Sequence, residues 1–243
     1  MTKKLAGKRV MITGAARRVG REFALAVARA GGDVILHYGH SSGEAKILQE
    51  EIGAFGVQAH LLQADLADPT QAAELIPRSA EFGCIYGLVN SAAIFEPLTL
   101  ANTDLAAWER HLAVNLTAPF LLCQSFARQV PQGEEGRIVN ILDWRALRPA
   151  ADHFAYTISK AALAALTHSL AAALAPGITV NGIALGAILP PSDGKPADDI
   201  LKMIPAKRWA RLNELGEALL FLLAGPSYVT GEIIHLDGGR HLL

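Results

Sequence analysis

The sequence predicts an α/β fold: one domain in which helices cover both faces of a doubly wound parallel sheet. Three observations predict this. Short apolar runs alternate with longer helical segments along the whole chain, the connections between them are short, and a glycine-containing loop follows the first apolar run. A chain of 243 residues with 51% hydrophobic and 19% charged residues can bury the core of such a domain.

Seven runs are predicted to be strands, because most are continuously apolar, as expected of parallel strands covered on both faces. They span residues 9–13, 33–38, 57–62, 85–90, 137–142, 178–183 and 232–236. Helical segments are predicted between them at 18–30, 43–55, 69–80, 105–130, 154–174 and 213–223. Since nothing resembles an interdomain linker, residues 1–243 are expected to form a single domain with right-handed crossovers.

One loop has an unusual composition. Residues 188–196 read Ile-Leu-Pro-Pro-Ser-Asp-Gly-Lys-Pro and follow the sixth predicted strand, at the edge where open α/β sheets bind ligands. We expect them to form a partly mobile cover over a substrate, within a substrate loop at about 186–205, although a plain turn would also fit.

Composition and charge narrow the class of partner. The net charge is -1 with no basic stripe, which favours a small molecule over nucleic acid. Cys84 and Cys123 are expected to be reduced core thiols, and no spacing indicates a metal site or a disulfide framework. No signal segment is recognisable, and Pro176 ends an alanine-rich helix that polar residues interrupt, so we expect no membrane span and a cytoplasmic location.

A loop with two glycines joins the first predicted strand to the first helix and reads Thr-Gly-Ala-Ala-Arg-Arg-Val-Gly over residues 13–20. Glycines permit a tight turn and a close backbone approach, and a helix N-terminus offers unpaired N–H groups to a pyrophosphate. The loop alone is a weak signal, but its place after the first strand of a βαβ unit strengthens it. We expect a dinucleotide to contact Gly14, Arg17, Arg18, Val19 and Gly20.

The end of the second predicted strand discriminates between dinucleotides. An NAD site commonly has Asp or Glu here to hold the ribose 2′-hydroxyl, whereas residues 36–42 read Leu-His-Tyr-Gly-His-Ser-Ser, with no acid until Glu44. Hydroxyls, imidazoles and the Arg17 guanidinium can bond a 2′-phosphate that a carboxylate would repel. NADPH is therefore the expected cofactor, and the expected contacts here are His37, Tyr38, His40 and Ser41. Ser42 alone is also explained as a helix cap.

Further cofactor contacts are expected after other predicted strands. Asp65, followed by Leu66, could accept from the adenine amino group or cap the turn before the next helix, and both readings stay open. Asn90 and Ala92 follow the fourth strand, where small residues would let a cofactor pass, and Gly186 follows the sixth.

Tyr156 and Lys160 place a phenol and an ammonium one turn apart on one helix face. This spacing is common by chance. It gains weight from Asp143, at the end of the fifth predicted strand, and from Asn115 within the long helix 105–130.

With these motifs the chain resembles the short-chain dehydrogenase/reductase family over essentially its whole length. The resemblance implies a Rossmann-type fold in which Tyr156 transfers a proton, Lys160 lowers the phenol pKa and bonds the nicotinamide ribose, and Asn115 supports a water that contacts the lysine. It also implies a homotetramer with residues 105–130 and 154–174 packed across one interface. The residues at matching places are Thr13, Gly14, Gly20, Asn90, Asn115, Tyr156, Lys160 and Asn181.

Two departures resemble the pteridine reductase branch of that family. Arg18 stands at the middle glycine of the loop, and Asp143 stands at the usual catalytic serine. In that branch the arginine meets cofactor phosphate and pterin, an aromatic residue at Phe95 stacks on the pterin, and the aspartate accompanies the catalytic tyrosine. The closing residues 237–241 also look like those of dihydropterin reductases. The match is incomplete at 90–93 and at 185–186, which leaves the substrate's side chain open.

Physical chemistry favours the aspartate for reduction of a C=N bond. A serine hydroxyl can donate to a developing alkoxide, whereas an ionised Asp143 accepts only and would oppose it. Reduction at C=N needs a proton on nitrogen instead. At about 4 Å, Lys160 would favour the Tyr156 phenolate by roughly 4 kcal/mol at an effective dielectric constant near 20, and Asp143 would oppose it by a comparable amount. We therefore expect the phenol to stay protonated and to act as an acid.

The sequence thus predicts an NADPH-dependent reductase that converts a dihydropterin or dihydrofolate-like substrate to the tetrahydro form. Arg18, Phe95, Asp143 and Tyr156 would contact the substrate. One competing hypothesis is a carbonyl reductase acting on a ketone or a ketoacyl thioester, and another is a catalytically silent NADP-binding regulator. Trp144 and Arg145 could border the pocket or pack at the surface, and both interpretations stay open. His153, near the site, is interpreted as a loop residue.

Overall fold

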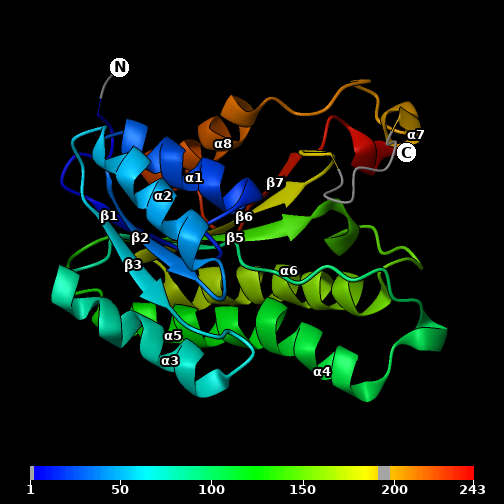
Figure 1. Ribbon diagram of the computed structural model, residues 1–243, viewed down its shortest axis with the longest axis horizontal. Helices are drawn as coiled ribbons and strands as arrows, with labels where there is room; N and C mark the ends of the chain where they lie inside the picture. Colours follow the sequence, from blue (N-terminus) through cyan, green and yellow to red (C-terminus); the bar gives the residue numbers. More distant parts are fainter. Residues whose placement is uncertain (1–2, 191–197) are drawn as a thin grey trace.

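Seven parallel strands form one sheet in the order β3-β2-β1-β4-β5-β6-β7, which confirms the predicted fold class (Figure 1). The computed structural model describes residues 3–190 and 198–243. The chain runs outward from the central β1, then returns to place β4 on its other side, so the switch point lies between β1 and β4. The strands are β1 (Arg9–Ile12), β2 (Asp33–Tyr38), β3 (Ala59–Gln63), β4 (Gly87–Asn90), β5 (Gly136–Asp143), β6 (Ile178–Leu185) and β7 (Ile233–Leu236).

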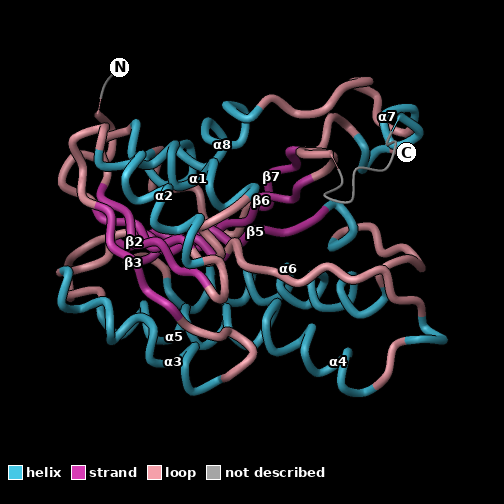
Figure 2. The backbone as a smooth tube through the Cα atoms, viewed as in Figure 1, coloured by secondary structure: helices cyan, strands magenta, loops and turns pink. Residues whose placement is uncertain are grey.

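Helices cover both faces of the sheet, as Figures 1 and 2 show. One face carries α1 (Arg18–Arg29), α2 (Ser42–Gly53) and α8 (Leu212–Ala224). The other carries α3 (Pro69–Arg78), α4 (Leu105–Leu112), α5 (Ala118–Gln129) and α6 (Phe154–Leu174). The short α7 (Asp198–Lys202) lies near the C-terminus.

The helical layers on the two faces of the sheet bury separate hydrophobic cores, and β1 shows why. Its side chains point alternately to the two faces: Val10 and Ile12 pack in the core that contains Phe23 of α1, whereas Met11 packs in the core that contains Phe126 of α5. All five side chains are fully buried. Hence the strands read as continuous apolar runs, because neither face meets water.

Both β5 and β6 run further than predicted. They stay paired to their last residues, where Asp143 is in register with Leu185. The polar Asp143 therefore belongs to the strand, and the ladder fixes its backbone at the carboxyl edge of the sheet.

The predicted helix 105–130 is interrupted. The π-helical turn Ala113–Thr117, which contains Asn115, separates α4 from α5. A π-turn adds one residue to a helical turn and is frequent at functional sites. The apolar pattern runs through it, so the sequence does not reveal the break.

α6 is long and apolar enough to cross a membrane by length and composition alone, with a mean hydropathy of 1.2. It also packs on β6 and buries Tyr156 and Lys160. The apolar composition of α6 is therefore explained by its place as a core helix of the domain.

The cover expected at 188–196 falls mostly on residues 191–197, which lie outside the described residues. Of the two cysteines, Cys123 is buried as expected, whereas Cys84 is exposed, and both are free thiols.

Candidate active site

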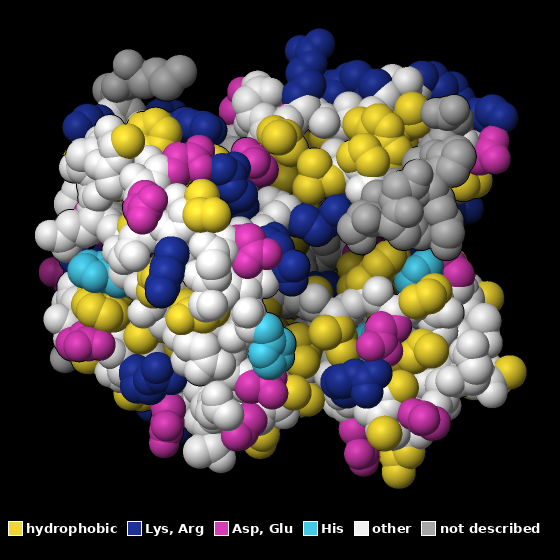
Figure 3. Space-filling model, viewed as in Figure 1, with side chains coloured by type: hydrophobic (Ala, Val, Ile, Leu, Met, Phe, Trp, Pro, Cys, Tyr) yellow, Lys and Arg dark blue, Asp and Glu magenta, His cyan; other side chains and the backbone are white. Residues whose placement is uncertain are grey.

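The residues expected to carry chemistry lie at the carboxyl edge of the sheet. The loop 13–20 follows β1, Ala92 comes soon after β4, Asp143 ends β5 and Gly186 follows β6. Ligands of open α/β sheets lie at this edge, beside the switch point. Figure 3 shows a hollow near the middle of this view, with Lys and Arg side chains at its rim.

Two glycines set the shape of the loop between β1 and α1. Gly14 has a φ of +63°, and a Cβ there would lie 2.9 Å from the Cα of Ala92. A Cβ on Gly20 would lie 2.2 Å from the carbonyl oxygen of Gly14, so only glycine allows this approach. α1 receives no side-chain cap from Arg17 and has no acidic residue in its first turn. The N–H groups and positive dipole end of α1 therefore fit a pyrophosphate.

Thr13 ties the two strands of the switch point together. Its Oγ1 accepts hydrogen bonds from the N–H groups of Ser91 at 2.9 Å and Ala92 at 3.0 Å. The segment after β4 is thereby held against the glycine loop, and the small Ala92 side chain borders the expected cofactor path.

Asn90 lies beneath that path rather than along it. Its side-chain Nδ2 donates to Asn140 Oδ1 at 2.8 Å and to Cys123 Sγ at 3.3 Å. Asn140 in turn donates to Thr167 Oγ1 at 2.9 Å. The Asn90 side chain therefore fixes the end of β4 from within the core, and the predicted cofactor contact is left to its backbone.

Arg18 has a left-handed backbone, with a φ of +52°. This region is costly for a residue with a side chain and is typical of functional sites, which explains why a glycine is common at this position. Its guanidinium Nη2 donates to the carbonyl oxygen of Pro190 at 3.1 Å and so joins the loop 13–20 to the segment after β6. The next residue, Val19, packs at the edge of the α1 core.

His37 corrects one prediction. Its imidazole is 2% exposed, its Nδ1 accepts from the N–H of Gly14 at 3.1 Å, and its Nε2 lies 3.1 Å from the carbonyl oxygen of Ala64. Both ring nitrogens are thus bonded inside the protein, and the ring cannot bond a 2′-phosphate. Burial lowers the pKa of His37 to about 4, so the neutral ring positions the glycine loop from below.

The side chains left for a 2′-phosphate surround the turn after β2. Tyr38 and Ser41 are half-buried and His40 is exposed. Ser41 precedes α2 without capping it through its side chain, which leaves the hydroxyl available. Arg17 Nη1 lies 3.6 Å from Glu44 Oε1, and both side chains are exposed. A carboxylate therefore competes for the arginine expected to hold the phosphate.

Two further expected contacts have structural roles. Asp65 Oδ1 accepts from the N–H of Ala67 at 2.9 Å, so this oxygen caps the turn, and Leu66 beside it is buried. At Gly186 a Cβ would lie 2.6 Å from the Cα of Asp237. Glycine is required there for the ends of β6 and β7 to meet.

Tyr156 and Asp143 face each other across the site. Tyr156 lies in the first turn of α6, and its hydroxyl donates to Asp143 Oδ2 at 3.3 Å. The other carboxylate oxygen accepts from the N–H of Arg145 at 2.9 Å and lies 3.5 Å from its Nη1. Since an ionised carboxylate only accepts, the phenol must carry its proton to make this contact.

Lys160 is buried one turn further along α6. Its Nζ donates to the carbonyl oxygen of Ile141 at 2.6 Å and lies 5.9 Å from the centroid of the Tyr156 ring. Burial lowers the pKa of Lys160 to about 8, against the opposing effect of Asp143. The ammonium form thus still predominates at neutral pH.

Asn115 ties the segment after β4 to α6. Its Oδ1 accepts from the N–H of Ile94 at 2.9 Å, and its Nδ2 donates to the carbonyl oxygen of Ile94 at 3.1 Å and to Ser159 Oγ at 3.0 Å. The π-helical turn brings this fully buried amide to Ser159, the residue before Lys160. Asn115 therefore positions the groups around the reaction centre.

The proton on Tyr156 is held by its surroundings. Burial raises the pKa of the phenol well above its usual value, and the Asp143 charge and hydrogen bond raise it further, while Arg145 lowers it. The sequence predicted a protonated phenol from a balance between Asp143 and Lys160. The protonated state agrees with that prediction, but burial is its largest cause.

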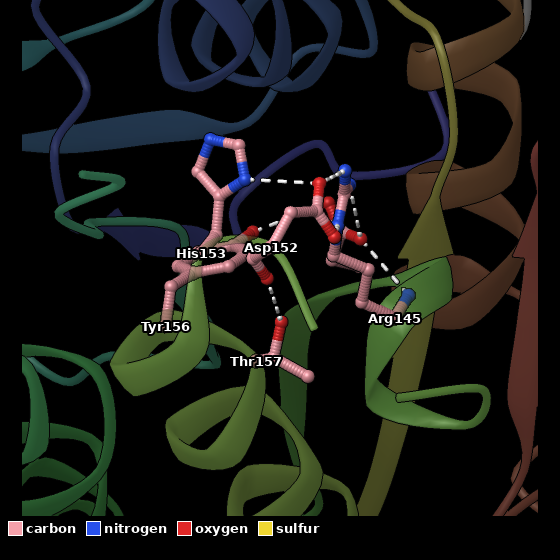
Figure 4. A network of polar contacts seen from close by, with 6 residues as sticks. Arg145, Asp152, His153, Tyr156 and Thr157 are labelled. Carbon is pink, nitrogen blue, oxygen red and sulfur yellow. Dashed lines mark hydrogen bonds and ion pairs between the residues drawn. The ribbon is translucent and has the colours of Figure 1, made fainter. Parts of the chain in front are cut away.

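A network of charges links Arg145, Asp152 and His153 beside Tyr156, as Figure 4 shows. Arg145 Nη2 donates to Asp152 Oδ2 at 2.6 Å, and His153 Nδ1 lies 3.1 Å from the same oxygen. The hydrogen bond from Arg145 lowers the pKa of Asp152 to about 2. Arg145 thus holds two carboxylates, one of which contacts Tyr156. Sequence reasoning missed this network, although an arginine two residues after an aspartate at a strand end is a usable signal.

Phe95 completes the border of the site. Its ring is 53% exposed, and the His153 ring stacks on it with centroids 3.9 Å apart and planes at 9°. The Tyr156 ring meets it edge-on at 4.6 Å. Phe95 therefore presents an aromatic surface beside the phenol, and His153, interpreted from the sequence as a loop residue, is part of that surface.

The arrangement can donate a proton to a planar substrate. A protonated phenol lies between a carboxylate and a buried ammonium, next to an aromatic surface and a loop that fits a dinucleotide. An oxyanion would be opposed by the Asp143 charge, because that carboxylate is the group bonded to the phenol.

Comparison with known proteins gives two kinds of relative. A family model described as enoyl-(acyl carrier protein) reductase matches residues 14–241. The chain is 31% identical over 242 residues to the 3-oxoacyl-[acyl-carrier-protein] reductase FabG of Staphylococcus epidermidis, covering 97% of this chain and 99% of that protein.

Among solved structures, the chain is similar to FolM alternative dihydrofolate reductase 1 from Brucella canis complexed with NADP. The identity is 35% and the TM-score 0.91, covering 99% of this chain and 96% of that one. A short chain dehydrogenase from Burkholderia cenocepacia in complex with NADP is 34% identical with a TM-score of 0.92, covering 98% and 99% of the two chains.

Proposed function

The chain belongs to the short-chain dehydrogenase/reductase family, and on this premise we propose that it is an NADPH-dependent reductase of a dihydropterin or dihydrofolate-like substrate. The observation that carries the proposal is the hydrogen bond from Tyr156 to Asp143, a carboxylate at the end of β5 where a serine hydroxyl is usual. Oxidoreduction is the activity of the family, and the substrate class is our inference.

The cofactor half of the proposal rests on the loop 13–20 and on the turn after β2. When bound, NADPH supplies the hydride. Gly14, Arg17, Arg18, Val19 and Gly20 would hold its pyrophosphate side, and Tyr38, His40 and Ser41 with Arg17 would hold the 2′-phosphate. The NADP complexes of the FolM and Burkholderia relatives support this choice. Asp65, Leu66, Asn90, Ala92, Lys160 and Gly186 would border the cofactor.

The chemical half concerns where the proton goes. Reduction of a C=N bond places negative charge on nitrogen, which needs a proton rather than an oxyanion clamp. Tyr156 would deliver that proton directly or through water, Asp143 would keep it on the phenol, and Lys160 would stabilise the phenolate that remains. Asn115 would hold the surrounding segments in place.

Substrate positioning rests on Phe95 and Arg18. A flat pterin ring stacked on Phe95 would lie beside the Tyr156 hydroxyl, because the two aromatic rings are in edge contact. Arg18, whose guanidinium spans the loop 13–20 and Pro190, would contact both cofactor phosphate and substrate. Stacking would hold the reacting atoms close.

Carbonyl reduction is the alternative that one observation favours, since the curated relatives include 3-oxoacyl-[acyl-carrier-protein] reductases. Against it stands Asp143, whose charge would destabilise the alkoxide formed from a ketone. A silent NADP-binding regulator is a weaker alternative, because Tyr156, Lys160 and Asn115 are all present and engaged.

A parallel substrate panel tests the proposal. NADPH absorbance is followed with dihydrobiopterin, dihydrofolate and acetoacetyl thioester, each with the unaltered protein and with Asp143→Ser. We expect turnover of a pterin substrate and a loss of about 10-fold or more in Asp143→Ser. Turnover of the thioester alone would establish carbonyl reduction instead, and tight NADPH binding without any turnover would favour the regulator.

We also propose a cytoplasmic homotetramer. The outer faces of α5 and α6 support self-association, since Phe120 is 41% exposed there and lines an apolar hollow with Leu170 and Leu174. Sedimentation of the purified protein would measure the assembly.

A further inference from the structure

Two guanidinium groups lie over the ring of Trp144, beside the reaction centre. The Cζ of Arg240 is 4.3 Å from the centroid of the Trp144 ring, and the Cζ of Arg145 is 4.8 Å from it. Trp144 directly follows Asp143, the residue that accepts from the Tyr156 hydroxyl. The two arginines thus lie close to the residue that follows the end of β5.

The charges of these two arginines are compensated differently. Arg145 is paired with Asp143 and Asp152. Arg240 has neither an ion pair nor a side-chain hydrogen bond within residues 3–190 and 198–243. Burial and the neighbouring charge of Arg145 lower its pKa, while the charges of Asp143, Asp152 and Asp237 oppose this shift. Since a guanidinium stays protonated in proteins, Arg240 is a cation with no ion-pair partner in the part of the chain that the structure describes.

The nearby carboxylates are already engaged. Asp143 and Asp152 bond Arg145, while Asp237 accepts from the N–H groups of Gly239 at 2.9 Å and His241 at 2.8 Å. Its Oδ2 also lies 2.8 Å from His241 Nδ1. Asp237 therefore uses its oxygens to shape the turn and makes no direct ion pair with Arg240.

The same contacts fix Arg240 in place. The turn Arg240–Leu242 begins after two glycines with left-handed backbones, Gly238 and Gly239, and Asp237 bonds it on both sides of Arg240. Stacking on Trp144 orients the guanidinium further. A cation held this way loses little conformational entropy when it binds an anion.

We propose that Arg240, supported by Trp144, is an anion subsite for a carboxylate carried on the tail of the substrate. This rests on the proposed function and narrows it: the preferred substrate would be a dihydropterin with an acidic tail, as in dihydrofolate, rather than one with a neutral hydroxylated tail. The ring would lie at Phe95 and Tyr156, and the tail would leave over Trp144 toward Arg240. Arg240 is here a specificity residue and takes no part in proton transfer.

The experiment compares two substrates in Arg240→Gln, using the full chain with NADPH. Dihydrofolate carries glutamate carboxylates, and dihydrobiopterin carries a neutral side chain. Losing a charge-assisted contact should raise the KM for dihydrofolate about 10-fold or more. The KM for dihydrobiopterin, both kcat values and the Kd of NADPH should stay within about twofold. Arg240→Lys should recover part of the dihydrofolate KM, because it keeps the charge and loses the planar fork.

Arg148→Gln is the matched control, because Arg148 is an exposed arginine close to Trp144 in sequence. It should leave both KM values unchanged. Three results with Arg240→Gln would overturn this inference and leave the proposed function standing. They are an equal rise in KM for both substrates, an unchanged KM for dihydrofolate, and dissociation of the proposed oligomer in sedimentation. If the unaltered protein reduces neither pterin, the proposed function falls and the inference falls with it.

Discussion

Replacing Asp143 by asparagine tests what keeps the catalytic proton on Tyr156. The phenol oxygen lies 3.3 Å from Asp143 Oδ2 and the Lys160 Nζ lies 5.9 Å from the centroid of the phenol ring. At an effective dielectric constant near 20, the first distance gives a repulsion of about 5 kcal/mol between carboxylate and phenolate. The Asp143 charge and its hydrogen bond both raise the pKa of Tyr156, so removing the carboxylate charge should lower it.

The assay is a spectrophotometric titration of tyrosinate, with the Tyr156→Phe spectrum subtracted so that only this residue is followed. Asp143→Asn keeps the shape of the side chain and an oxygen that can accept from the phenol. We expect the Tyr156 titration and the alkaline limb of kcat/KM to move together to lower pH. Asp152→Asn is the control, because Asp152 contacts Arg145 and not the phenol. An unmoved titration in Asp143→Asn would refute the reasoning.

Three further predictions concern buried and exposed charges. Burial lowers the pKa of Lys160 from 10.5 to about 8, so Lys160→Met should raise the free energy of unfolding by up to about 3 kcal/mol at pH 7. That gain should vanish as the pH rises to 10.5, and urea denaturation without this trend would contradict it. Burial lowers the pKa of His37 from 6.5 to about 4. The free energy of unfolding should therefore drop by about 3 kcal/mol as the pH is lowered from 6.5 to 4, because the folded protein resists protonation of the buried ring. His37→Gln, which cannot titrate, should flatten that loss and weaken NADPH binding through Gly14; an identical pH curve would argue against it. Glu44→Gln should free Arg17 and raise the affinity for NADPH by up to about fivefold, while the affinity for NADH stays unchanged. Calorimetry at low salt would measure both affinities. An equal gain for NADH would show that Glu44 does not compete with the 2′-phosphate for Arg17.

The fold was predictable because its signals are local. Most strands are short apolar runs, since helices cover both faces of the sheet. The glycines of the loop 13–20 mark the turn between the first strand and the first helix. The carboxyl-edge rule then places Asp143 near Tyr156, although they lie on different elements. The register that holds Asp143 in β5 needed the structure, because a polar residue at a strand end reads equally well as a loop.

The direction of side chains was less predictable. The sequence of β2 reads as a fully buried strand, and a histidine inside such a run is usually bonded internally. His37 follows that rule, but its position beside Tyr38 and His40 favoured a phosphate contact instead. The π-helical turn at Asn115 was hidden for a similar reason, because one extra residue in a turn leaves the apolar composition unchanged.

The charge network around Arg145 depends on how the chain folds back between β5 and α6. Asp152 and His153 lie against Arg145 in a segment where His153 takes a left-handed backbone, with a φ of +51°, just before α6. A histidine in that conformation is uncommon and is not indicated by periodicity. Hence the residues that orient Asp143, and the stacking of His153 on Phe95, emerged only from the structure.

A structure of the protein with NADP and a dihydropterin analogue bound together would test the proposed function most directly. We expect the pterin ring to stack on Phe95 with a ring nitrogen within hydrogen-bond distance of the Tyr156 hydroxyl, while Asp143 stays in contact with that hydroxyl. A pterin bound away from Phe95, with Asp143 turned away from Tyr156, would contradict the proposed function.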